Sequence, residues 1–217
     1  HSFRYVKLVS ILFNTKSKIF LHDHSSKFTK TPLFLNSLLK PSYFIGVSNK
    51  LTDWAATTLN IKKEHIYLLK NIVIKEHTFK KERKGMVIVG NIKPVKNQLF
   101  AIRLTARLGE DLTIIGKGTK QAEFIDYIEL NGLKQHISFK GLVSRNILYN
   151  LLCDYDVSVI PSRKESFSLF AVESMMAKVP IIVSDVPGLS EISGNHSFIF
   201  ESENIDHLSS CISKVVT

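Results

Sequence analysis

The fold of this chain is indicated most clearly by the stretch Pro161-Ser162-Arg163-Lys164-Glu165-Ser166-Phe167-Ser168-Leu169-Phe170-Ala171-Val172-Glu173. Two carboxylates, Glu165 and Glu173, bracket a turn of small and aromatic residues that opens a helical pattern at residues 169–178. Apolar strand patterns lie just before this segment, at residues 157–160, and just after it, at residues 180–183. A strand, a tight loop, a helix and a second strand are typical of a parallel sheet, so we expect the loop at the carboxyl edge of that sheet.

The turn between the two carboxylates has the features of an anion site. The first N–H groups of a helix have no partner within the helix, and the helix dipole adds positive character at the same end. In open α/β sheets, ligands bind at the carboxyl edge of the strands. The sequence therefore predicts a phosphate-bearing ligand, flanked by two carboxylates that could hold its hydroxyl groups.

The second half of the chain alternates regularly between strand and helix patterns. Besides the elements above, we expect strands at residues 86–90, 112–115, 137–139 and 198–200, and helices at residues 98–108, 120–131, 147–153 and 205–216. Short apolar strands separated by helices are typical of a parallel sheet that is covered on both faces. Residues 85–217 are therefore predicted to form a doubly wound, Rossmann-like α/β domain.

The first part of the chain shows the same alternation with fewer elements. Its strand patterns lie at residues 19–21, 44–47 and 65–69, and its helix patterns at residues 3–13, 33–39 and 49–59. Because three strands are few for a doubly wound sheet, residues 1–78 are interpreted as the end of a larger N-terminal α/β domain, followed by a basic linker at residues 79–84. The first residue is His1 and not Met, so we expect a fragment, with an upstream signal left open.

The composition is that of an ordinary folded protein. The 217 residues are 44% hydrophobic and 22% charged, which is enough apolar material for real cores. No apolar run approaches the roughly 20 residues that span a bilayer. Cys153 and Cys211 lie far apart in apolar helical patterns and in no metal or redox motif, so we expect buried thiols in a reducing cytoplasm, with a disulfide or a reactive thiol as alternatives.

The formal net charge of +10 admits three explanations. A composition rich in Lys, Asn and Ile can reflect codon bias alone. Alternatively, the charge attracts the chain to an anionic membrane surface or to a phospholipid-linked substrate. Nucleic acid is not expected as a partner, because arginine is sparse and no basic motif with interleaved aromatic residues is present.

Several segments form an ordered series around the opening motif. The motif itself has the form E-x7-E and is followed by Pro180-Ile181-Ile182-Val183-Ser184-Asp185-Val186-Pro187-Gly188 and Glu191. It is preceded by Ile114-Ile115-Gly116-Lys117-Gly118 and by Phe139-Lys140-Gly141-Leu142-Val143-Ser144. In order and spacing, this series resembles the retaining GT-B glycosyltransferases of family 4, also called group 1 glycosyltransferases. The resemblance covers nearly the whole chain and is best over residues 86–193.

The resemblance implies a division of roles within the motif. Glu173 would accept hydrogen bonds from the ribose hydroxyls of a nucleotide-sugar donor, and Glu165 would lie beside the transferred sugar. The diphosphate would be cradled by the loop and its backbone amides, at Ser166, Phe167, Ser168 and Leu169.

Three positions outside the motif complete the implied site. Lys96 matches the family lysine that neutralises the departing diphosphate, Val143 ends the segment that would border the base, and His1 falls on a family histidine that faces the donor sugar. A lysine and a helix N-terminus supply positive charge, so no divalent metal and no cofactor beyond the nucleotide-sugar are expected. For His22 and His24, at a strand end, we expect a structural or hydrogen-bonding role.

The chain departs from the family pattern at three positions. Asn91 stands where the family usually has arginine, which removes one of two phosphate-facing cations, and Lys93 is the candidate substitute. Ser166 and Ser168 replace both glycines of the E-G-F-G loop, which restricts the backbone and crowds the phosphate, although their hydroxyls could donate hydrogen bonds in return. These changes bear on the strength of donor binding more than on its location.

The resulting hypothesis is a metal-independent glycosyltransferase that moves a sugar, with retention, to a glycan or lipid-linked acceptor in cell-surface polysaccharide synthesis (capsule or lipopolysaccharide). We expect it in the cytoplasm, peripherally on the inner face of the cell membrane. The fragment alone is expected to be inactive, because the acceptor site would lie mainly in the missing N-terminal part. Two alternatives stay open: a catalytically silent nucleotide-sugar-binding subunit, favoured by Asn91 and Ser166, and a nucleotide-sugar epimerase of the same architecture.

Overall fold

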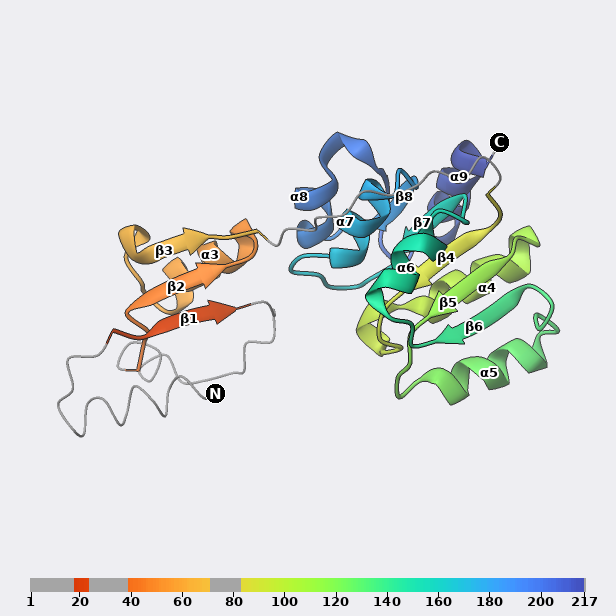
Figure 1. The fold of residues 1–217 in the computed structure, drawn as a ribbon, viewed down its shortest axis with the longest axis horizontal. Helices are drawn as coiled ribbons and strands as arrows, with labels where there is room; N and C mark the ends of the chain where they lie inside the picture. The colour runs from red at the N-terminus through yellow and green to blue at the C-terminus, as the bar shows by residue number, and fades with distance from the viewer. Residues whose placement is uncertain (1–17, 24–38, 71–82, 217) are drawn as a thin grey trace. The chain divides into compact units, whose positions relative to one another are not determined.

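The computed structural model describes residues 18–23, 39–70 and 83–216. The chain divides into two compact units, residues 1–72 and 73–217, and each unit has its own parallel sheet (Figure 1).

The predicted linker, residues 79–84, lies mostly outside the described residues. Its last two residues are attached to the second unit. Arg83 Nη1 donates to the carbonyl of Lys178 at 2.8 Å, and the backbone N–H of Lys84 donates to the carbonyl of Asp154 at 2.9 Å. These bonds attach the start of the second unit to two of its turns, at Asp154 and Lys178.

The first unit contains three parallel strands in the order β1-β2-β3. Its described elements are β1 (Phe20–Asp23), β2 (Tyr43–Gly46), α3 (Asn49–Thr58), the 3-10 helix η1 (Lys63–His65) and β3 (Ile66–Leu68). Leu51 and Ala55, one helical turn apart on α3, are both buried, as is Phe44 of β2. The spacing of these apolar residues explains why α3 covers the sheet.

The second unit is built on a six-stranded parallel sheet in the order β6-β5-β4-β7-β8-β9 (Figure 1). The strands are β4 (Met86–Val89), β5 (Leu112–Ile115), β6 (Ile137–Gly141), β7 (Val157–Ile160), β8 (Ile181–Ser184) and β9 (Phe198–Phe200). The strand order reverses between the neighbours β4 and β7, so the loops that follow these two strands meet at the carboxyl edge of the sheet. In doubly wound sheets, ligands bind at this reversal.

The described part of the second unit has six α-helices. They are α4 (Gln98–Leu108), α5 (Gln121–Leu130), α6 (Arg145–Leu152), α7 (Leu169–Met176), α8 (Pro187–Ser193) and α9 (Ile205–Val216). Two 3-10 helices, η2 (Pro94–Lys96) and η3 (Gly194–His196), lie in the loops.

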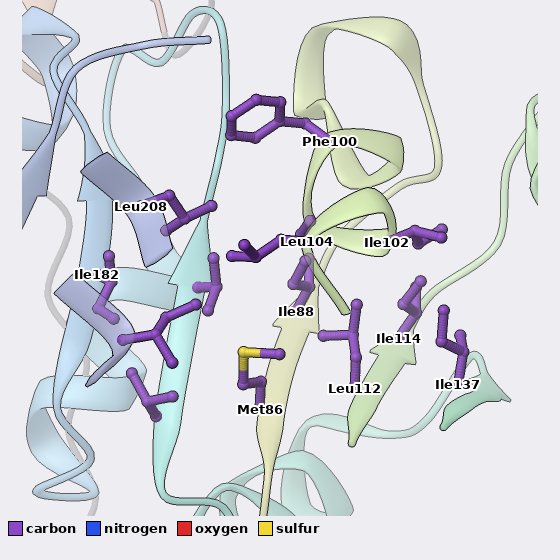
Figure 2. Packing of buried hydrophobic residues seen from close by; sticks show 14 of the residues in the cluster. Met86, Ile88, Phe100, Ile102, Leu104, Leu112, Ile114, Ile137, Ile182 and Leu208 are labelled. Atoms are coloured by element: carbon purple, nitrogen blue, oxygen red, sulfur yellow. The ribbon is translucent and has the colours of Figure 1, made fainter. Parts of the chain in front are cut away.

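Two hydrophobic clusters lie on the two faces of this sheet. Met86 and Ile88 of β4 belong to the cluster formed with α4, α5 and α9, whereas Val87 belongs to the cluster formed with α6, α7 and α8. Figure 2 shows the first cluster, in which Leu104 of α4 and Leu208 of α9 pack over the strands. Because both faces are covered, every residue of β5, β7 and β8 is buried, which explains why three of the four residues in each strand are apolar.

The sequence predicts all six strands of this sheet and five of the six helices, but it misses α8. No helix is predicted at Pro187 and Gly188, which follow the predicted strand at residues 180–183. In the structure Pro187 is instead the first residue of a seven-residue helix, a position at which proline's missing N–H is not needed.

Helix ends also shift from their expected positions. α6 begins at Arg145, two residues before the expected start, because the Ser144 hydroxyl caps it by accepting from the N–H of Ile147 at 3.4 Å. α7 ends at Met176, and Lys178 has a φ of +51°, which no helix continues. The predicted helix at residues 3–13 and nearly all of that at residues 33–39 lie outside the described residues.

Both cysteines are buried free thiols, as expected. Within the described residues, the structure contains no helix with the length and apolar character that crossing a bilayer requires.

Candidate functional site

The loop between β7 and α7 carries both glutamates of the motif. Ser168 caps α7, because its Oγ accepts a hydrogen bond from the N–H of Ala171 at 3.3 Å. The helix therefore begins at Leu169, and its first backbone N–H groups have no acceptor within the helix. This arrangement places a helix N-terminus between Glu165 and Glu173, as the sequence predicts.

The two serines that replace the family glycines fit this loop without backbone strain. Ser166 and Ser168 are both buried, and neither has a positive φ; that of Ser168 is −103°. Since the loop does not use the left-handed region here, a Cβ carries no conformational cost. The restriction that serine places on the backbone angles is therefore compatible with this loop, and Ser168 serves the loop as a helix cap.

Glu165 is held by side chains from two loops. It is 8% exposed, and its Oε1 accepts from the Lys96 ammonium and from Ser162 Oγ, the latter at 3.2 Å. Its backbone is fixed as well, since a Cβ on Gly188 of α8 would lie 2.3 Å from the Glu165 carbonyl oxygen. Only glycine permits this approach, so α8 helps to position the carboxylate.

Lys96 reaches Glu165 from the β4–α4 loop. The loop turns at Asn97, which has a φ of +55°, and it is bonded to the neighbouring β7–α7 loop. The Arg163 N–H donates to the carbonyl of Val95 at 2.9 Å, and Arg163 Nη1 donates to that of Pro94 at 3.0 Å. The strand reversal thus brings together two loops that lie 69 positions apart at the Lys96–Glu165 contact.

A small pocket lies where these loops meet. It is lined by apolar residues of β4 and β7 and by the polar residues Lys96, Gln98, Ser162, Glu165 and Ser168. The side chain of Lys96 is 31% exposed, so the pair that it forms with Glu165 can be reached by a ligand.

Glu173 has a different environment inside α7. It is 4% exposed, and the nearest cation is Arg145, whose Nε lies 3.6 Å from Oε1. Burial raises the pKa of Glu173, while the charge of Arg145 and a hydrogen bond from the Tyr149 hydroxyl oppose that rise. Burial also raises the pKa of Tyr149, which keeps its hydroxyl protonated as a donor.

Two glycines allow neighbouring loops to pack against the β4–α4 loop. A Cβ on Gly116, which has a φ of +144°, would lie 2.1 Å from the carbonyl oxygen of Gly90, and a Cβ on Gly118 would lie 2.1 Å from that of Ile92. The N–H of Gly116 also donates to the carbonyl of Gly141 at 2.8 Å. The loops after β4, β5 and β6 are therefore in direct backbone contact at this edge.

Three further residues named from the sequence, Asn91, Val143 and Lys93, lie in the loops of the second unit. Asn91 is exposed, and its carbonyl accepts from Gln98 Nε2 at 2.9 Å. Val143 is half-buried at the end of the segment after β6. Lys93, the candidate substitute for the missing arginine, lines a different pocket of about 260 Å³ with Arg103 and Lys120.

Of the three predicted histidines, one lies within the described residues. His22 is exposed on β1 of the first unit. His1 and His24 lie outside the described residues. The described residues also contain no group of three or more His, Cys, Asp or Glu side chains that could hold a metal ion.

Sequence reasoning missed four residues that hold the two carboxylates: Ser162, Gly188, Arg145 and Tyr149. Ser162 and Gly188 lie within segments that were recognised, so only their contacts were missed. Arg145 and Tyr149 are spaced four residues apart on α6, which places them on one helical face. The early helix start at the Ser144 cap was the signal that could have revealed this face.

The chain matches a family model described as "Glycosyl transferases group 1" over residues 70–217. The chain belongs to this family. The match includes the β7–α7 loop, the β4–α4 loop and every strand of the second unit.

Relatives of this glycosyltransferase chain are longer than the chain itself. Over 115 residues it is 33% identical to an uncharacterized glycosyltransferase of Methanocaldococcus jannaschii. The aligned region covers 51% of this chain and 30% of that protein. Over 165 residues it is 28% identical to the O-antigen chain mannosyltransferase RfbU of Salmonella typhimurium, covering 73% of this chain and 46% of that one. The chain thus spans less than half the length of either relative.

The fold of this group 1 glycosyltransferase chain is also that of solved structures. Anabaena HepE, crystallised in complex with UDP, aligns with a TM-score of 0.81 at 17% sequence identity, covering 99% of this chain and 66% of HepE. At this identity the likeness concerns the fold. The predicted GT-B type α/β architecture is confirmed.

Proposed function

We propose that this chain carries the donor-binding part of a retaining glycosyltransferase that uses a nucleoside-diphosphate sugar. One observation carries the proposal: a helix N-terminus, a lysine and two buried carboxylates, Glu165 and Glu173, lie at the strand reversal of a doubly wound sheet. A nucleotide-sugar offers the matching groups, which are a diphosphate, a ribose and a sugar with several hydroxyls.

Each part of the donor has a counterpart at this edge. The ribose hydroxyls would donate to Glu173, and the diphosphate would accept from the loop amides at the start of α7. The sugar would lie by Glu165. The base would lie along the segment that ends at Val143. Membership of the family and the UDP bound to Anabaena HepE support this placement.

Lys96 links the sugar and diphosphate ends of the proposed site. Its ammonium contacts Glu165 and shares that carboxylate with the Ser162 hydroxyl. A bound diphosphate would compete with Glu165 for this cation, so donor binding would redistribute the hydrogen bonds of the pair. Asn91 carries no charge, which makes Lys96 the main side-chain cation for the leaving group.

The proposed reaction follows from these positions. The bond from the anomeric carbon to the diphosphate breaks, and a bond to the acceptor hydroxyl oxygen forms on the same face of the sugar. A diphosphate oxygen takes the acceptor proton, while Lys96 and the α7 amides stabilise the charge that develops on the leaving group. These cationic and dipolar groups do the work that a divalent metal does elsewhere, so we propose a metal-independent transfer.

The acceptor is proposed to be a glycan or lipid-linked saccharide of a cell-surface polysaccharide. The similarity to an O-antigen mannosyltransferase supports this class, and the net charge of +10 supports a peripheral position on an anionic inner membrane face, in the cytoplasm. Co-sedimentation with vesicles that contain anionic lipid tests the membrane contact. Vesicles of neutral lipid serve as the control.

One observation favours a second function. Asn91 replaces a phosphate-facing cation of the family, which suits a subunit that binds the nucleotide-sugar without transferring it. Product analysis with the intact protein separates the two functions, because a silent subunit yields neither donor hydrolysis nor transfer.

The decisive experiment for donor binding is a thermal-shift panel followed by calorimetry. Uridine, guanosine and adenosine diphosphates and their sugars are tested on the 217-residue chain, and at least one should raise its melting temperature. If none binds at millimolar concentration, the proposal fails. The anomeric configuration of the product, read by NMR with the intact protein, tests retention.

A further inference from the structure

Helix α6 holds Glu173 through two side chains one turn apart. Arg145 is the first residue of the helix and Tyr149 lies four positions later, so both face the carboxylate on α7. Tyr149 is buried, whereas the Arg145 side chain is 64% exposed. Among the described residues, these two are the titratable or charged groups that act on Glu173.

The contacts with Arg145 and Tyr149 affect whether Glu173 is ionised, and therefore which hydrogen bonds it can make with a ligand. A buried carboxylate without partners would take up a proton, and a protonated carboxyl group donates one hydrogen bond where the ionised form only accepts. Ribose hydroxyls need an acceptor with a fixed orientation. The Tyr149 hydroxyl and the Arg145 guanidinium both contact the carboxylate and favour its ionised form, which accepts hydrogen bonds from a ligand.

We propose that Tyr149 and Arg145 are positioning residues for Glu173, and that their hold on its carboxylate sets how strongly the site prefers a ribonucleotide over its 2′-deoxy or 3′-deoxy counterpart. The inference rests on the proposed function, because it assumes that ribose binds at Glu173. It adds the residues outside the ribose contact on which that preference depends.

The test compares affinities of the 217-residue chain for UDP, 2′-deoxy-UDP and 3′-deoxy-UDP by calorimetry, with the guanosine series if GDP binds better. Tyr149→Phe keeps the ring and removes only the hydroxyl. Tyr155→Phe is its matched control, since Tyr155 is equally buried but bonds to Thr113. Arg145→Gln removes an exposed charge without threatening the core, and Arg145→Lys should restore most of its effect.

The expected result is a selective loss of ribose preference. In Tyr149→Phe the ratio of ribo to deoxy affinity should fall about tenfold, as for a lost hydrogen bond to a charged group, and in Arg145→Gln by about threefold. Tyr155→Phe should keep the wild-type ratio. The ratio of ribo to deoxy affinity should fall at low pH, where Glu173 takes up a proton. The midpoint of this fall should lie at a higher pH in Tyr149→Phe and in Arg145→Gln, because each variant lacks a group that favours the ionised form of Glu173.

Failure of the inference can be told apart from failure of the proposed function. If the wild type prefers ribonucleotides and neither variant changes the ratio or its pH midpoint, the positioning role is overturned. Equal weakening of ribo and deoxy ligands overturns it too, because a purely structural role predicts that result. If the wild type binds no nucleotide, the proposed function fails, and the inference fails with it.

Discussion

Glu165 and Glu173 belong to one motif, but their surroundings differ in kind. Glu165 lies in the loop, where a lysine and a serine hydroxyl already occupy one of its oxygens. Glu173 lies within α7, where a neutral tyrosine and an exposed arginine are its partners. The first carboxylate is matched by a cation in contact, and the second is desolvated with weaker compensation.

The difference in surroundings shows how two glutamates only eight positions apart can be suited to different ligand groups. A carboxylate in contact with a lysine can exchange that partner for another, which suits a position where Lys96 would also meet a diphosphate. A desolvated carboxylate gains most from hydroxyl donors that approach without charge. In the proposed site, the environment of each glutamate would therefore distinguish the sugar end from the ribose end.

The largest effect is expected from Glu173→Ala. Two hydrogen bonds from ribose to a charged acceptor would be lost, so affinity for the best nucleotide of the panel should fall roughly a hundredfold. Calorimetry measures it, and Glu165→Gln is the control, since Glu165 should matter for the nucleotide-sugar more than for the nucleotide. Unchanged affinity would falsify the ribose assignment.

Gly188→Ala tests how firmly α8 fixes the other carboxylate. A Cβ there would lie 2.3 Å from the Glu165 carbonyl oxygen, so the backbone must shift, and the free energy of unfolding should fall by about 2 kcal/mol. Gly132→Ala is the contrasting variant: its φ is +66°, but no atom lies within 4 Å of the added Cβ. Denaturant unfolding should show the greater loss in Gly188→Ala, and the reverse order would place the strain in the backbone angle.

Lys96→Ala tests whether Lys96 contributes to binding of the diphosphate or of the nucleoside. Affinity for UDP is expected to fall about tenfold, as for a charge-assisted contact, while affinity for uridine stays unchanged. Lys93→Ala is the matched control, because Lys93 lines another pocket. An equal loss for UDP and uridine would mean that Lys96 acts through the loop and not through the phosphates.

Much of the local structure of the motif could be predicted from the sequence, because a short segment encodes it. The strand before the motif and the helix after it are encoded within twenty residues, and both carboxylates lie in the same short stretch. The cap at Ser168 became visible only in the structure. The glycines at Gly116 and Gly118 follow a recognised pattern, although the sequence did not reveal that they admit the backbone of the β4–α4 loop.

The parts that could not be predicted depend on contacts between distant segments. Lys96 and Glu165 meet across 69 positions, and Arg145 faces Glu173 only because α6 and α7 pack on the same side of the sheet. Helix α8 escaped prediction because proline followed by glycine favours a turn when the neighbouring packing is unknown. The sequence pattern predicts which types of residue lie at the site, whereas the partners of each carboxylate depend on tertiary packing.

The smallest effect is expected from Glu173→Gln, read as stability against pH. Folding raises the pKa of Glu173 through burial, so the folded chain binds this proton more tightly than the unfolded chain. Stability should therefore fall as pH rises from the ordinary carboxyl pKa through the raised one. The amide does not titrate and can still accept from Tyr149, so the variant should be more stable than the wild type at neutral pH.

Denaturant unfolding in steps from pH 3 to pH 8 measures this difference. The gap should close toward the acidic end, where the wild-type carboxyl is protonated in both states. Glu165→Gln is the informative counterpart, because it replaces the charged partner of the Lys96 ammonium with a neutral amide and should lower stability at neutral pH instead. If stability at neutral pH rises in Glu173→Gln and falls in Glu165→Gln, the difference between the two carboxylates is supported. A gap for Glu173→Gln that is independent of pH would show that burial does not set the charge of this residue.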